Sequence, residues 1–374
     1  MKRLVKLLTV CLLAVVMVCG LFGCTPDGAP SGEKGLKFEK RHNENFYTVS
    51  GFVDDGSTTL SIPAEVDGVA VGRIGTNAFK NNGTLTSIVV PTSVKEIEAG
   101  AFIGVKALRE ITLPFIGMNA NSDVCYGETA GSEGEENEKA TDIERHFAYI
   151  FGTDEYTYGS QITATYSASG TATYYLPHAL SKVILNSDSA YSIPMYAFAG
   201  VTTVREIVLP ATIDAIGESA FSNCANLTKV NVPASVEKIY DSAFSGCTRL
   251  VKGGITFDDL TSTCALTTIG NKAFYATKLT EITLPASVTT IGEQCFATSA
   301  LRSIVLPASL TEIGFYAFYD CKSLTSVDIS AVTGTVIVKN AAFMNCERLD
   351  ATTLKASAKL DVTGSANVFE GTLA

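Results

Sequence analysis

The side chains that most often carry chemistry are few in this sequence, and they form no known catalytic motif. The three histidines, His42, His146 and His178, lie far apart. The chain contains no H-E-x-x-H zinc pairing, no G-x-S-x-G nucleophile elbow, no phosphate-binding P-loop and no C-x-x-C pair. Because catalysis needs groups that converge on one point, the sequence predicts a protein that is not an enzyme and uses no cofactor.

An acidic run offers the densest set of oxygen ligands in the chain. Its sequence is GETAGSEGEENE, and it includes Glu133, Glu135, Glu136 and Glu138. Carboxylates are ligands that calcium prefers, so calcium binding is one hypothesis for this run. A solvated loop without an ion is the other, and charge runs are more commonly of that kind. We therefore predict no metal site.

Tyrosine is concentrated in the same part of the chain. Seven of the 14 tyrosines lie between residues 115 and 179. Tyrosine is enriched at recognition surfaces, so one interpretation is a ligand-binding segment. The equal alternative is a solvated loop in which a few tyrosines pack locally. The candidate ligand residues are Tyr156, Tyr158, Tyr166, Tyr174 and Tyr175.

A repeated motif determines how all these residues are positioned. The copies LTEITLPASVTTIGEQCFAT and LRSIVLPASLTEIGFYAFYD begin 22 residues apart, at Leu279 and Leu301. A fixed period of this length is typical of stacked coils, each too short to bury its apolar residues without a neighbour. The sequence therefore predicts a repeat solenoid of about ten to eleven coils.

Each coil has the same predicted parts. The I-x-L segment alternates and ends at proline, which predicts one strand per coil in a parallel sheet. The V-x-x-I segment returns on the other side, and the Ala-Phe pair predicts a short helical turn that places the ring in the core. We expect a spine of stacked rings. The closing phenylalanines are Phe79, Phe102, Phe198, Phe221, Phe244, Phe274, Phe296, Phe318, Phe343 and Phe369.

The residue between the two apolar positions of I-x-L points away from the core. Half of the residues in this column are Val or Ile. Strand propensity alone accounts for such residues; the alternative is that the column receives a protein ligand on an exposed, concave sheet face. The column is Val89, Thr112, Ile184, Val208, Asn231, Thr283, Val305 and Asp328.

Four cysteines stand three residues after a closing phenylalanine: Cys224, Cys247, Cys321 and Cys346. Other coils carry Thr277 or Ser299 at the same position, so a cysteine here is not an obligate half of a disulfide. We predict free, poorly reactive thiols that stack in the core.

The repeat resembles that of the BspA-like leucine-rich repeat proteins of microbial surfaces, L-x-x-I-x-L-P…I-G-x-x-A-F-x-x-C. The resemblance covers nearly all of the chain after Phe46 and implies a leucine-rich-repeat solenoid, mainly β, with roles in surface display and adhesion. The stretch that breaks the period, at about 115–179, resembles a long repeat of this family, L-P-F-I-G…F-x-Y-I-F-G. That likeness implies that Phe147, Ile150 and Phe151 lie in the core.

The first residues resemble the signal peptide of a bacterial lipoprotein. A basic start is followed by the apolar stretch Leu7–Val18, which is too short to span a bilayer. Residues 21–24, LFGC, resemble a lipobox, which implies cleavage after residue 23 and acylation of Cys24. A plain secretory signal with an unrelated cysteine is the alternative. We predict a polar tether over residues 24–45 and the solenoid over residues 46–374.

The charge balance limits the partners. The formal net charge is −10, and it is −13 without Lys2, Arg3 and Lys6 of the signal. Such a surface repels nucleic acid. We predict binding to extracellular or cell-surface proteins and attachment to a membrane through the lipid. A structural envelope component without a discrete ligand and a glycan-binding protein are the alternative functions.

Overall fold

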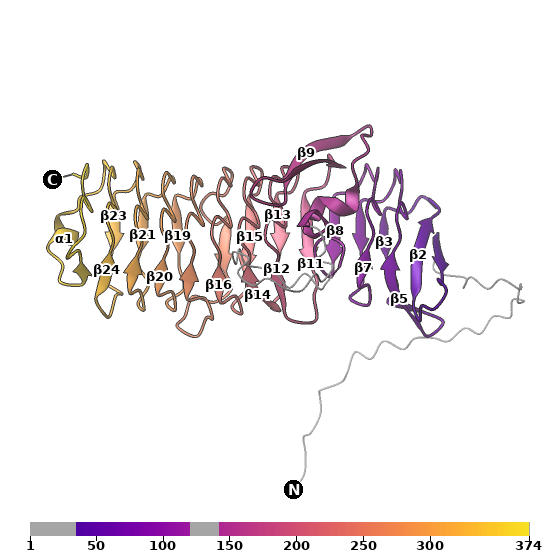
Figure 1. Ribbon diagram of the computed structural model, residues 1–374, viewed down its shortest axis with the longest axis horizontal. Helices are drawn as coiled ribbons and strands as arrows, with labels where there is room; N and C mark the ends of the chain where they lie inside the picture. Colours follow the sequence, from indigo (N-terminus) through magenta and orange to yellow (C-terminus); the bar gives the residue numbers. More distant parts are fainter. Residues whose placement is uncertain (1–34, 120–141, 374) are drawn as a thin grey trace, which may run out of the picture.

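A computed structural model describes residues 35–119 and 142–373, and in that part the chain winds into an elongated solenoid of about 12 turns (Figure 1). The two ends of the described chain lie at opposite ends of the stack, whose axis is nearly straight in this view. The predicted solenoid and its parallel sheets are confirmed. Three predictions lie outside the described residues: the signal peptide, the acylated Cys24 and the acidic run at Glu133.

The I-x-L segments form strands that pair in parallel along the stack. Seven of them make one sheet: β3 (Thr59–Ser61), β6 (Ser87–Val89), β8 (Glu110–Leu113), β11 (Lys182–Leu185), β13 (Glu206–Val208), β15 (Lys229–Val232) and β17 (Ile255–Phe257). Three more form a separate sheet further along the stack: β19 (Glu281–Thr283), β21 (Ser303–Val305) and β23 (Ser326–Asp328). Equivalent template residues face one another, as Ile282 faces Ile304.

One strand per coil is an incomplete description, because the returning V-x-x-I segment also pairs. It forms an eight-stranded parallel sheet from β12 (Tyr191–Ile193), β14 (Ile213–Ile216), β16 (Lys238–Ile239), β18 (Thr268–Ile269), β20 (Thr290–Ile291), β22 (Glu312–Ile313), β24 (Val336–Val338) and β25 (Leu360–Asp361). Most of these strands are only two or three residues long. Their alternation is too short to be recognised in the sequence.

The predicted phenylalanine spine is confirmed. Neighbouring rings such as Phe221 and Phe244 stack with centroids 5.0 Å apart and planes 11° from parallel. In the long gap between Phe102 and Phe198, the rings of Phe151 and Phe147 complete the spine, at centroid distances of 6.2, 5.3 and 4.8 Å along the series. The predicted core position of Phe147, Ile150 and Phe151 is therefore correct, since all three are fully buried.

The segment around each closing phenylalanine is not the predicted helical turn. The residues two before and two after the ring, such as Ser219 and Asn223 around Phe221, have positive φ in each of the ten coils. The N–H groups of Ser219, Phe221 and Asn223 donate to the next coil at 2.9, 2.8 and 2.8 Å. A helical turn would use these donors within its own coil, whereas the left-handed residues turn them outward into a third ladder between coils.

The six described cysteines are free and buried, which confirms the prediction for Cys224, Cys247, Cys321 and Cys346. Each of these four thiols donates to the phenylalanine carbonyl of the preceding coil at 3.1 Å, as Cys247 does to Phe221. Burial raises the pKa of Cys247 to about 12. A thiol held protonated in this way is a poor nucleophile.

The N-terminal cap begins earlier than predicted. Residues 36–39, assigned to the tether from the sequence, form β1 (Leu36–Glu39), which pairs antiparallel with β2 (Tyr47–Phe52). The side chains of Leu36 and Phe38 in β1 are buried in the core. The cap continues through β4 (Glu65–Val66), β5 (Val69–Ile74) and β7 (Glu96–Ile97). At the other end, α1 (Thr352–Lys355) and β25 form a less regular last turn.

The segment that breaks the period is more ordered than predicted. It holds two 3-10 helices, η1 (Asp142–Arg145) and η2 (Phe147–Phe151), and an antiparallel hairpin of β9 (Gly159–Thr165) and β10 (Thr171–Pro177). The sheet is continuous beneath it, because β8 pairs directly with β11, with Glu110 opposite Lys182. The hairpin projects from one edge of the stack (Figure 1).

Candidate ligand-binding surface

The strand register aligns the predicted outward column as a row across the sheets. Val89 faces Thr112, and Thr112 faces Ile184, in the seven-stranded sheet. Thr283, Val305 and Asp328 face one another in the three-stranded sheet. The row is interrupted between β17 and β19, which do not pair.

Exposure differs along this row. Val89, Ile184, Val208 and Asn231 are only half-buried, and Thr112 is buried, at 8% exposure. Thr112 is therefore a wrong assignment to a ligand surface. The last three members of the row, Thr283, Val305 and Asp328, are exposed.

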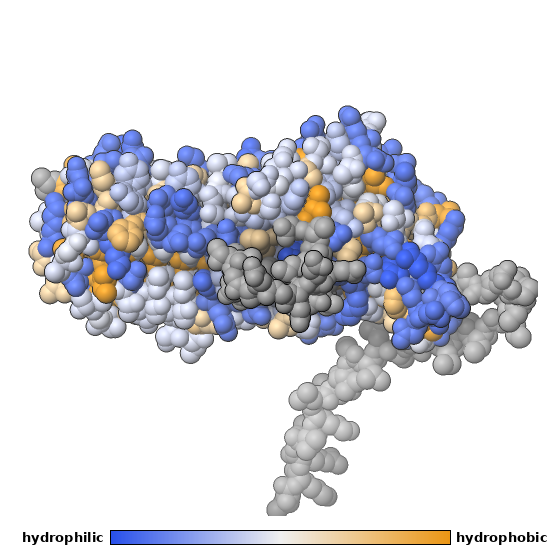
Figure 2. Space-filling view, in the orientation of Figure 1, coloured by the Kyte–Doolittle hydropathy of each residue, from blue (hydrophilic) through white to orange (hydrophobic). Residues whose placement is uncertain are grey.

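Two polar members of the row have structural partners. The Asn231 side chain accepts a hydrogen bond from the backbone N–H of Leu209 at 2.8 Å and donates to its carbonyl at 2.9 Å. Asp328 accepts from the backbone N–H of Ser330 at 2.7 Å. Val305, 49% exposed at the last position of β21, has no such structural role. Figure 2 shows hydrophobic surface along the C-terminal coils among otherwise polar surface.

The tyrosines of the hairpin segment mostly pack locally. Tyr174 is buried, stacks with His146 at a centroid distance of 6.4 Å, and has its pKa raised to about 12 by burial. Its assignment to the ligand surface is wrong. Tyr166 and Tyr175 are half-buried, and Tyr158, at 69%, is the exposed tyrosine among the described residues of this segment.

Tyr156 is a separate case among these tyrosines. Its side chain is half-buried, and its hydroxyl is enclosed without a hydrogen-bond partner among the described residues. Burial raises the pKa of this hydroxyl above its usual value. The hydroxyl therefore stays neutral and turns toward the protein, so Tyr156 offers a ligand only part of its ring.

His146 holds the hairpin segment to the solenoid. Its Nδ1 accepts from the Ala148 N–H at 3.0 Å, and its Nε2 lies 3.0 Å from the Ala199 carbonyl, to which it donates. Burial lowers the pKa of His146 to about 4, so the ring is neutral at pH 7. These contacts assign a structural role to the ring, which joins η2 to the coil of Phe198.

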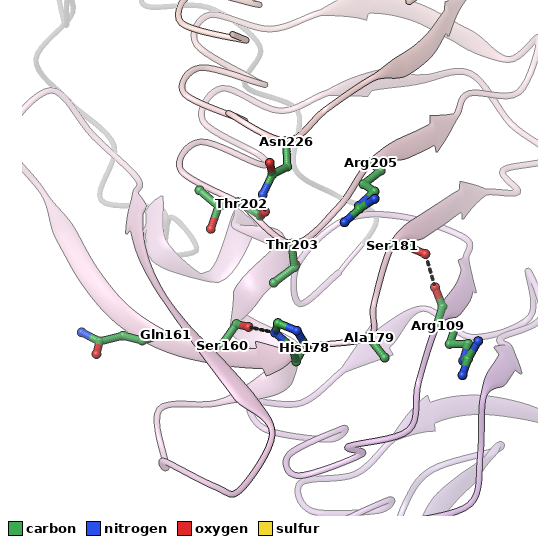
Figure 3. Close-up of a pocket in the computed structure, with 10 residues that line it drawn as sticks. All are labelled: Arg109, Ser160, Gln161, His178, Ala179, Ser181, Thr202, Thr203, Arg205 and Asn226. Carbon is green, nitrogen blue, oxygen red and sulfur yellow. Dashed lines mark hydrogen bonds between the residues drawn. The ribbon is translucent and has the colours of Figure 1, made fainter. Parts of the chain in front are cut away.

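A cavity of about 700 Å³ opens where the base of the hairpin meets the sheet (Figure 3). The hairpin contributes Ser160 and Gln161, and His178 follows it directly. The solenoid contributes a column of residues that directly precede strands, and further residues from two turns. The cavity is lined by Arg109, Ser160, Gln161, His178, Ala179, Ser181, Thr202, Thr203, Arg205 and Asn226.

Backbone ladders place the charged residues of this cavity. Arg109, Ser181 and Arg205 each precede a strand, and the N–H of Ser181 donates to the Arg109 carbonyl at 3.0 Å. The Arg205 N–H donates to the Ser181 carbonyl at 2.8 Å. The two arginines therefore stand two strand spacings apart, about 10 Å, with a short serine between them. Sequence reasoning missed this pair because the template leaves the position free.

Two smaller recesses lie toward the C-terminus. One, of about 300 Å³, occupies the break between β17 and β19 and is lined by Phe257, Leu260 and Ile282 among others. The other, of about 340 Å³, is lined by Tyr275, Tyr316 and Tyr319 at the closing turns. The exposed Thr283 and Val305 thus continue from the first recess along the sheet.

The described residues hold neither a metal-binding cluster nor a membrane-spanning helix. Within residues 35–119 and 142–373, no three His, Cys, Asp or Glu side chains are arranged to hold a metal ion. Over the same ranges, no helix has the length and apolar content needed to cross a membrane. The calcium hypothesis for the acidic run concerns residues outside these ranges.

Comparison with known proteins gives a family and several similar folds. Residues 72–145, 170–263 and 267–372 match the BspA type leucine rich repeat region, in six copies. The search of curated proteins finds no match. A leucine-rich repeat protein from Bacteroides ovatus is similar in structure, with 18% identity, 91% of each chain covered and a TM-score of 0.39. A leucine rich cell surface protein from Faecalibacterium prausnitzii has 19% identity, covers 85% of this chain and 93% of its own, and has a TM-score of 0.30.

Proposed function

The chain belongs to the BspA-type leucine-rich repeat family, whose repeats serve protein interaction, and we propose that it is an adhesion protein attached to a bacterial cell surface by a lipid. The observation that carries the proposal is the exposed row of Thr283, Val305 and Asp328. Its apolar member, Val305, ends β21, the central strand of the three-stranded sheet, and does not contribute to the core. Contiguous exposed apolar surface is typical of an interaction site, and the recess that adjoins this row is lined by Phe257, Leu260 and Ile282.

The proposed partners are extracellular or cell-surface proteins. A variant with Thr283→Glu and Val305→Glu puts two charges on the exposed row, where they meet solvent and leave the fold intact. We expect it to lose saturable binding to a panel of extracellular matrix proteins and intact cells. The measurement is a solid-phase binding curve with the purified protein, beside its circular dichroism spectrum and melting temperature.

Ile337→Glu is a matched control, because Ile337 is an equally exposed apolar residue, 46% accessible, in a strand of the opposite sheet. Undiminished binding by the double variant would move the site off the sheet, to Tyr158 and Tyr175 of the hairpin segment. Absence of any saturable binding by the native protein would instead support the structural envelope component, the second candidate.

The proposed anchor is Cys24, and its support is the lipobox-like sequence alone. Labelled palmitate should mark the native protein in growing cells and leave Cys24→Ala unlabelled. Cys224→Ala serves as the control, because that thiol is buried in the solenoid. Label that survives the Cys24 substitution would exclude this cysteine as the lipid site.

A further inference from the structure

The cavity between the hairpin and the sheet contains two cationic side chains that the fold does not neutralise. Arg109 and Arg205 are exposed, and neither forms an ion pair with any described residue. The acidic side chains of the neighbouring column are already paired: Glu110 with Lys182 at 3.0 Å, and Glu206 with Lys229 at 3.1 Å. In a chain with a net charge of −10, two unpaired arginines at one cavity form a local site for an anion.

Apart from Ala179, the remaining lining is polar and has unused hydrogen-bonding capacity. The Thr203 hydroxyl is buried and has no hydrogen-bond partner among the described residues. The Nδ2 of Asn226 donates to the Thr202 carbonyl at 2.6 Å, which leaves its Oδ1 free to accept. The Nδ1 of His178 is occupied by Ser160 Oγ at 3.0 Å, which leaves Nε2 for a ligand (Figure 3).

From these features we propose that the cavity binds an acidic saccharide, with its carboxylate or sulfate held between Arg109 and Arg205. Arginine binds planar oxyanions through two parallel hydrogen bonds. The hydroxyls and amides of the lining match the hydroxyls of the sugar, and about 700 Å³ is in the size range of small-ligand sites. The inference goes beyond the proposed adhesion to proteins, because it adds a second ligand class at a separate place on the molecule.

The lining argues against an acidic peptide as the occupant. Peptides and proteins gain most of their affinity from apolar or aromatic anchors buried in a pocket. Ala179 is the one aliphatic side chain that lines this cavity. A peptide would therefore find charge here but no pocket for an anchor, whereas a sugar needs hydrogen-bonding groups on several sides.

The test is isothermal titration of the purified protein with four probes: a glucuronate-containing tetrasaccharide, its sulfated counterpart, its carboxyl-reduced analogue and a hexaglutamate peptide. We expect at least one acidic saccharide to bind, and the reduced analogue and the peptide to show no binding. Because each arginine contributes charge-assisted hydrogen bonds, Arg109→Ala and Arg205→Ala should each weaken binding about tenfold. Added salt should weaken it further.

Arg302→Ala is the matched control, because Arg302 occupies the same position before a strand, is exposed, and lies outside the cavity. It should change affinity by less than about twofold, as no contact is lost. The proposal is overturned if neither acidic saccharide binds, if the reduced analogue binds equally, or if both arginine variants bind as the native protein does. Arginine-dependent binding of hexaglutamate would replace the saccharide by an acidic peptide.

Failure of this inference is distinguishable from failure of the adhesion proposal. If the saccharides fail while the Thr283 and Val305 double variant still loses binding to matrix proteins or cells, the sheet face acts alone. If the saccharides bind while no matrix protein or cell is bound, the cavity stands and the proposed adhesion to proteins fails.

Discussion

The regular coils from Leu279 to Phe343 and the segment from residue 142 to 177 complete the same core by different means. In the regular coils each buried position repeats, so Phe296, Phe318 and Phe343 stack at 5.4 and 5.0 Å. In the segment, Phe147 and Phe151 fill the spine from a 3-10 helix, and a buried histidine joins that helix to the next coil.

The difference shows which residues the fold needs for its core and which residues remain exposed for binding. A regular coil commits its apolar residues to neighbours above and below, and only residues such as Val305 are left outward. The irregular segment projects a hairpin from the stack and thereby creates a cavity against Arg109 and Arg205. The repeat accordingly explains stability, and its exceptions are the places to look for ligands.

The largest effect should come from removing one ring of the spine. Phe244 is fully buried between Phe221 and Phe274, so Phe244→Ala should lower the free energy of unfolding by about 3–5 kcal/mol. Phe315→Ala, at a ring that is 43% exposed in a later coil of the same solenoid, should cost less than about 1 kcal/mol. Urea unfolding measures both, and equal midpoints for Phe244→Ala and the native protein would contradict the stacking.

The template glycine should give the next largest effect. A Cβ on Gly292 would lie 2.6 Å from the Gly270 carbonyl carbon and 2.7 Å from the Asn271 nitrogen. Both are backbone atoms of the preceding coil, which cannot move without separating the coils, so Gly292→Ala should cost about 1–3 kcal/mol. Gly334→Ala meets nothing within 4 Å and should be neutral in the same thermal unfolding experiment. A neutral Gly292→Ala would mean that coils separate more easily than this contact implies.

The sequence predicted what repeats and missed what the template leaves free. The Phe spine, the strand position and the stacked thiols follow from period and burial. The left-handed turn was missed, although the position two after the ring is Gly or Asn in seven of the ten coils, as at Asn81 and Gly104. These are the residues that adopt positive φ at least cost. The cavity was missed because Arg109 and His178 are 69 positions apart and meet only through the hairpin.

A pH experiment separates the segment from the regular coils. The pKa of buried His146 is about 4, against about 6.5 for histidine in an unfolded chain. Between these values the unfolded chain takes up a proton that the folded one refuses, so stability is lost as the pH falls. By pH 5 the loss should be about 2 kcal/mol. Unfolding of the native protein and of His146→Gln at pH 7 and pH 5 measures it, and an unchanged pH dependence in the variant would refute the assignment.

The smallest effect should come from the thiol column, where the regular coils tolerate exchange. Cys247 donates to the Phe221 carbonyl at 3.1 Å, and the Cys224 N–H reaches the same carbonyl at 3.2 Å. Because Cys247→Ser keeps a donor and Cys247→Ala leaves the carbonyl one partner, we expect changes below about 1 kcal/mol for serine and near 1 kcal/mol for alanine.

The same column decides whether stacking or bridging holds adjacent coils together. Cys224 and Cys247 occupy one position in coils about 4.8 Å apart, which is within the Cα separation that a disulfide spans. Their hydrogen bonds point along the stack to carbonyls instead of to each other, and burial raises the pKa of both thiols. Non-reducing mass spectrometry should therefore find both free in protein exported to an oxidising compartment. Quantitative bridging between them would show that covalent bonds, and not stacking alone, hold the regular coils together.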